Sequence, residues 1–74
     1  MRTKDIQRAS NMLTEAYELL HDIAAERDEY EEERPEGWAD TVAGEKYIQD
    51  TATIQTAAHE IETLEGQIYE IVNP

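Results

Sequence analysis

The stretch Arg34-Pro35-Glu36-Gly37-Trp38-Ala39 separates two segments of helical periodicity, residues 3–33 and 41–72. Pro35 cannot continue a helix and disfavours helical geometry in the residue before it. Gly37 permits backbone angles that other residues avoid. Strand-like alternation is absent from both segments. We therefore expect an all-α fold, an antiparallel two-helix hairpin.

The hairpin is expected to form a single domain. Its boundaries would be residues 1–74 for the domain, about 3–33 for the first helix, about 34–40 for the turn and about 41–72 for the second helix. Asp40 or Thr41 would cap the second helix, because either side chain can accept a hydrogen bond from a free backbone N–H.

Apolar residues recur at alternating spacings of three and four, the heptad pattern of helices packed along a seam. The first seam is expected to hold Ile6, Ala9, Leu13, Ala16, Leu20, Ile23, Arg27 and Tyr30. The second is expected to hold Tyr47, Asp50, Ile54, Ala57, Ile61, Leu64, Ile68 and Ile71. Antiparallel pairing then sets Arg27 opposite Asp50 and Tyr30 opposite Tyr47.

The apolar face of the first helix is wider than one neighbouring helix can cover. The residues expected to self-associate are Met12, Tyr17, Leu19 and Leu20. We expect a homo-oligomer, most simply a two-fold dimer that forms a four-helix bundle. The alternative is that this face binds a different protein.

The composition excludes several classes of protein. The 74 residues include 18 acidic and 6 Lys or Arg side chains, a net charge of −12, and no cysteine. Disulfides and thiolate metal sites are therefore excluded. Direct binding to nucleic acid or to an anionic membrane is unfavourable, because phosphates would repel the chain. Without a long apolar stretch or a signal peptide, we expect a soluble, unprocessed, cytoplasmic protein.

One motif has the spacing of a metal ligand set. The tetrapeptide Glu18-Leu19-Leu20-His21 matches the Glu-x-x-His spacing of di-iron bundles. The heptad phase, however, directs both ends of this motif, and His59 and Glu62, toward solvent. We therefore expect no metal and no cofactor. Catalysis is not expected either, because the single serine, Ser10, has no base beside it and the acidic side chains have no apolar pocket.

The strongest feature is the acidic run Glu26–Glu36, with seven carboxylates against two arginines. Such charge at a helix C-terminus is unfavourable for folding, which suggests selection for binding. The expected partner-binding residues are Glu29, Glu31, Glu32, Glu33, Glu36 and Trp38. They would occlude a basic, nucleic-acid-binding surface of a partner by imitating phosphates. The alternatives are that the charge serves only solubility, including in high salt, and that Trp38 packs over Tyr30 and Tyr47.

The Glu-rich run, the turn Arg34-Pro35-Glu36-Gly37 and the helix start Gly44-Glu45-Lys46 resemble a class of short acidic helical-hairpin proteins of phages and other mobile elements. The resemblance covers about residues 18–72 and is compositional. Some members of that class inhibit host defence nucleases, including CRISPR effectors and restriction enzymes. The resemblance implies an inhibitor acting in the host cytoplasm on a nucleic-acid-binding enzyme. The competing expectation is a homo-oligomeric scaffold protein.

Overall fold

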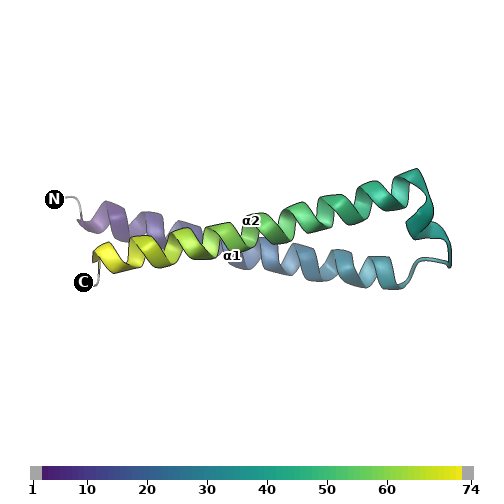
Figure 1. The fold of residues 1–74 in the computed structure, drawn as a ribbon. Coiled ribbons are helices and arrows are strands. Elements are labelled where there is room, and N and C mark those ends of the chain that lie inside the picture. Colours follow the sequence, from purple (N-terminus) through teal and green to yellow (C-terminus); the bar gives the residue numbers. More distant parts are fainter. Residues whose placement is uncertain (1–2, 73–74) are drawn as a thin grey trace.

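The computed structural model describes residues 3–72, and two long helices account for most of them (Figure 1). Helix α1 spans Thr3–Glu32 and helix α2 spans Val42–Val72, with a short 3-10 helix, η1, at Trp38–Asp40 in the connection. The helices run antiparallel, so both termini lie at one end and the turn lies at the other. The all-α helical hairpin expected from the sequence is confirmed, and no strand occurs within residues 3–72.

The hairpin is a thin rod with a small core. Its radius of gyration is 16.6 Å and its extents are 55 × 15 × 15 Å, whereas a compact domain of this length would have a radius of gyration of about 11 Å. The buried residues between the helices are small: Ala24 and Ala58 are buried apolar residues, and Ser10 and Thr51 are buried polar ones. No large side chain of the described residues is fully buried. The backbones therefore approach each other through small side chains.

Eleven of the sixteen expected seam residues are half-buried, Ala16, Ile23 and Ala57 among them, and five are exposed. The confirmed positions also include Ile6, Leu13, Leu20 and Arg27 in α1 and Tyr47, Ile54, Ile61 and Ile68 in α2. Further enclosed positions lie one residue beyond expected ones: Ser10, Tyr17, Ala24, Glu31, Thr51, Ala58, Glu65 and Val72. The residues expected there that are instead exposed are Ala9, Tyr30, Asp50, Leu64 and Ile71. The four buried residues among the enclosed positions, Ser10, Ala24, Thr51 and Ala58, are all small, because closely spaced backbones leave no room for large side chains.

The expected pairing of Arg27 with Asp50 is wrong, because this displacement brings Thr51 to the arginine instead. Arg27 Nε donates to Thr51 Oγ1 at 2.8 Å, and Nη2 donates to the Tyr47 carbonyl at 3.1 Å. Asp50 lies at the surface and pairs with Lys46 Nζ at 2.9 Å, one turn earlier in the same helix. Arg27 is therefore held between the helices by uncharged acceptors.

The turn ends at Thr41. Of the two residues expected to cap α2, Asp40 and Thr41, it is Thr41 that does so. Its hydroxyl donates to the Trp38 carbonyl at 2.6 Å and accepts from the Gly44 N–H at 3.0 Å. Gly37 has a positive φ of 89°, a conformation that favours glycine. Gly44 is buried against η1, so close that a Cβ there would overlap the Trp38 carbonyl. Two glycines are thus required by the geometry of the turn.

Candidate interaction surfaces

The turn end of the hairpin is strongly acidic. We call residues 26–46 the acidic tip; they hold nine carboxylates and three basic side chains. The last turns of α1, η1 and the first turn of α2 meet there (Figure 1). Four of the five glutamates expected to bind a partner are exposed: Glu29, Glu32, Glu33 and Glu36. The fifth, Glu31, is half-buried at a seam position, and its Oε1 atom is enclosed without a hydrogen-bond partner among the described residues.

Both arginines of the acidic tip stack their guanidinium groups on tyrosine rings. The Arg27 guanidinium lies 3.8 Å from the centroid of the Tyr47 ring. The Arg34 guanidinium lies 4.1 Å from the Tyr30 ring centroid, and its Nε donates to the Tyr30 carbonyl at 3.2 Å. Within residues 3–72, neither arginine forms a salt bridge to a carboxylate of the tip. The glutamates of the tip are therefore left with their full charge.

Trp38 belongs to an aromatic cluster that closes the tip. Its ring centroid lies 5.9 Å from that of Tyr30 and 5.6 Å from that of Tyr47, edge-on to both. The two tyrosine rings are 4.9 Å apart, which confirms their expected pairing. Edge-to-face packing at these distances is favourable for aromatic rings. Trp38 therefore packs over the tyrosines, and its half-buried side chain still reaches the surface between exposed glutamates.

A set of exposed and half-buried apolar residues from both helices lies on one side of the hairpin. The opposite side is marked by contacts between the helices: Gln55 Nε2 donates to Asp28 Oδ2 at 3.4 Å, and Tyr17 and Glu62 border one groove. Residues three and four apart share a helix face, so the residues beyond the seam from these contacts lie together. We call this set the apolar face: Ala9, Met12, Ala16, Leu19 and Ile23 of α1, with Ala57, Leu64 and Ile71 of α2.

The large side chains of the apolar face are open to solvent. Their exposed fractions are 59% for Met12, 62% for Leu19, 49% for Leu64 and 56% for Ile71. None of the helices within residues 3–72 has the length and apolar character needed to cross a bilayer. The residues expected to self-associate are divided: Met12 and Leu19 lie on the apolar face, Leu20 lies in the seam, and Tyr17 lies on the other side of the hairpin.

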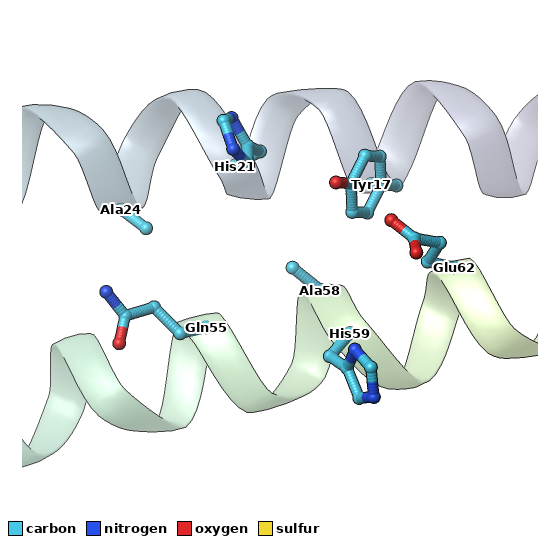
Figure 2. A pocket seen from close by; sticks show the side chains of 7 residues that line it. All are labelled: Tyr17, His21, Ala24, Gln55, Ala58, His59 and Glu62. Carbon is cyan, nitrogen blue, oxygen red and sulfur yellow. The ribbon is translucent and has the colours of Figure 1, made fainter.

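The other side carries a shallow groove of about 150 Å³ (Figure 2). Its lining residues are Tyr17, His21, Ala24, Gln55, Ala58, His59 and Glu62. Tyr17 and Glu62 face each other across the helices, whereas the ring of His59 points away from α1. The Tyr17 and His21 ring centroids are 5.9 Å apart. The hydrogen bond and the negative charge of Glu62 raise the pKa of the Tyr17 phenol, because both favour its neutral form.

Glu18, His21, His59 and Glu62 are all exposed, as the heptad phase predicted. The heptad assignment placed His21, His59 and Glu62 away from the seam. In the structure, part of the seam lies one residue further along each helix. These three residues therefore border one groove. Glu18 lies beside an adjoining hollow with Tyr17 and Glu62. Within residues 3–72, no three His, Asp or Glu side chains lie close enough together to hold a metal ion.

Comparison with known proteins does not assign the chain to a family: it matches no family model, no curated protein and no solved structure at a significant level. The acidic tip and the apolar face are therefore the features of the molecule that bear on its function.

Proposed function

We propose that the protein is a non-enzymatic inhibitor whose acidic tip occludes a basic, nucleic-acid-binding surface of a partner enzyme. The observation that carries the proposal is the engagement of Arg27 and Arg34 by tyrosine rings. Arginine is the residue best suited to neutralise carboxylates, because its planar fork binds them through two hydrogen bonds. Here the guanidinium groups of Arg27 and Arg34 contact aromatic rings and uncharged acceptors. The carboxylates of the acidic tip are therefore not neutralised by these arginines.

The mechanism is electrostatic and steric. Duplex DNA carries one charge per about 1.7 Å of axis, and a helix rises about 1.5 Å per residue, so closely spaced carboxylates approach that charge density. A single exposed ion pair contributes only about 0.2–1 kcal/mol, so recognition requires many charges acting together. Such an array mainly accelerates association with a basic surface. The 15 Å width of the rod suits it to entering a groove.

The partner class we propose is a nucleic-acid-processing enzyme in the cytoplasm, such as a CRISPR effector or a restriction nuclease. Glu29, Glu32, Glu33 and Glu36 would replace the phosphates of the substrate, because their side chains are exposed at the tip. Trp38 would add an apolar contact among them, as aromatic side chains do in many interfaces.

We also propose that the apolar face pairs with a second copy to form a four-helix bundle. The side chains of Met12, Leu19, Leu64 and Ile71 are exposed. Because the hairpin buries few residues of its own, it gains stability when a second copy covers these apolar side chains. A second candidate function follows from the same face: a homo-oligomeric scaffold in which the acidic surface serves only solubility.

The two candidate functions differ in a competition assay. A type II restriction endonuclease and a Cas9-type effector are each incubated with labelled DNA and increasing amounts of the protein. The proposal expects DNA to be displaced, and a variant with Glu29, Glu32, Glu33 and Glu36 changed to Gln to lose that ability. The matched control changes four exposed glutamates outside the tip: Glu15, Glu18, Glu60 and Glu70. Equal loss in both variants, or no displacement by the parent, favours the scaffold.

A further inference from the structure

The apolar face and the charges of the hairpin together restrict how a second copy can dock. We propose that two hairpins pair through their apolar faces in an antiparallel arrangement, with the acidic tip of each copy extending past the termini of the other. This inference rests on the proposed self-association. It adds the orientation, and therefore the number and position of the acidic tips that a dimer presents.

The apolar face occupies only part of the rod. From Ala9 to Ile23 it spans about 21 Å at 1.5 Å per residue, while the molecule is 55 Å long. Toward the turn, the same side of the hairpin carries charged residues, among them Glu26 and Asp50. The apolar face is therefore offset toward the termini, and the acidic tip lies beyond it.

The described basic side chains outside the acidic tip lie at the opposite end of the rod. Lys4 and Arg8 are exposed in the first turns of α1 and form no ion pair within residues 3–72. Going along α1, Arg8, Glu15, Asp22 and Glu26 follow at spacings of seven and four, so they border the apolar face on one edge. The edge is basic at the terminal end of the molecule and acidic toward the tip.

A parallel dimer, with both turns at the same end, would set the two acidic tips side by side. Packed helices are about 8–10 Å apart, which is no greater than the Debye length of about 8–10 Å near physiological salt. The repulsion between two sets of nine carboxylates would therefore be only partly screened. A parallel orientation is therefore unfavourable at the turn end of the dimer.

An antiparallel dimer buries the same apolar face with complementary edges. Superposing the centres of the two faces brings Met12 of one copy near Leu19 of the other. Arg8 then lies beside Asp22 and Glu26 of the second copy, and Lys4 lies near its Glu26. Residues beyond Glu29 extend past the N-terminus of the second copy. Both acidic tips stay free, at opposite ends of the dimer, so one dimer can engage two basic surfaces.

The test measures the distance between the two tips. The chain has no cysteine, so Ala39→Cys in the exposed η1 segment places one spin label at each tip. We expect a distance of about 60 Å between labels in the antiparallel dimer, from the helix rise, and about 20 Å in a parallel one, from the helix spacing. Glu36→Cys, also exposed, repeats the measurement in case the first label disturbs the turn.

Cross-linking gives a second readout with its own controls. A mixture of Lys4→Cys and Glu26→Cys chains should form disulfide-linked heterodimers, while each variant alone forms few linked homodimers. Abundant Glu26→Cys homodimers, or a short distance between tips, would overturn the antiparallel arrangement while leaving self-association intact. A monomer in sedimentation equilibrium at high concentration would overturn both. The DNA competition assay tests the acidic tip independently of either outcome.

Discussion

Gly44 in the first turn of α2 lies against the backbone of Trp38, so closely that a Cβ at Gly44 would overlap the Trp38 carbonyl oxygen. The same carbonyl accepts hydrogen bonds from the Thr41 hydroxyl and the Thr41 N–H. This contact joins η1 to α2 and positions Trp38 over the tyrosines. The geometry of the acidic tip therefore depends on a residue without a side chain.

Replacing Gly44 with Ala should destabilise the hairpin. The added methyl group meets backbone atoms that cannot rotate away, and overpacking of this kind costs about 1–3 kcal/mol. Gly66 offers a matched control in the same helix, because a Cβ there has nothing within 4 Å. Gly66→Ala should raise stability by about 0.5–1 kcal/mol. Urea denaturation followed by circular dichroism measures both; equal shifts in the same direction would contradict the contact.

Replacing Thr41 with Ala should lower the free energy of unfolding by about 1 kcal/mol. The substitution removes the hydroxyl that accepts from the Gly44 N–H and leaves a helix start without its cap. Thr41→Ser keeps the hydroxyl and should retain most of the stability. The same urea titration tests this prediction, and it is wrong if the Ala and Ser variants unfold at the same midpoint.

The sequence was sufficient to predict the two helices and the turn, because Pro35 and Gly37 interrupt the helical pattern directly. It was not sufficient for the phase of the seam. Counting apolar residues favoured Leu64 and Ile71, but α2 approaches α1 through the small residues Thr51 and Ala58, and approaches η1 through Gly44. These three residues recur every seven positions, and that spacing of small side chains was the available signal.

The surfaces were partly predictable for the same reason. Charge is visible in sequence, so the acidic tip could be located, but the neighbours of each charge could not. The pairing of Arg27 depends on whether position 50 or 51 faces it, which is decided by a one-residue shift. The exposure of Leu64 follows from that same shift. The extent of the apolar face therefore depends on the packing of the two helices and cannot be read from the sequence.

The Tyr17 phenol should titrate above its ordinary pKa of about 10. Its hydrogen bond with the Glu62 carboxylate favours the neutral form. Because the pKa in the folded state is raised, this stabilisation is fully present below the unfolded pKa and is lost as the pH rises through the folded pKa. Glu62→Gln should lower the pKa of Tyr17 toward its ordinary value. Absorbance titration compared with Tyr17→Phe isolates the signal; an unchanged pKa in Glu62→Gln contradicts the assignment.

Leu19→Glu should prevent self-association and leave the hairpin folded, because this side chain is 62% exposed in the single chain. Leu20→Glu should unfold the chain, since Leu20 lies between the helices and enclosing an unpaired charge costs several kcal/mol. Sedimentation velocity gives the mass, and circular dichroism gives the helix content. A dimeric Leu19→Glu variant would show that the apolar face is not the interface.

The unneutralised carboxylates of the acidic tip should themselves limit stability. Glu29, Glu32 and Glu33 crowd the C-terminal end of α1, where the helix dipole disfavours negative charge and like charges repel. Changing these residues and Glu36 to Gln should therefore raise the free energy of unfolding, by about 0.3–1 kcal/mol for the dipole term at low salt.

The dependence on salt identifies the cause of that gain. The Debye length falls from about 10 Å at 0.1 M to about 3 Å at 1 M, so added salt should stabilise the parent more than the four-Gln variant. Urea midpoints of the two proteins should converge at high salt. A constant difference between them would mean that the gain does not come from charge, because electrostatic repulsion is screened by salt; Gln and Glu differ little in helix propensity, so propensity would not explain it either. Convergence would show that the acidic tip costs folding free energy through its charge, as expected if the carboxylates are maintained for binding.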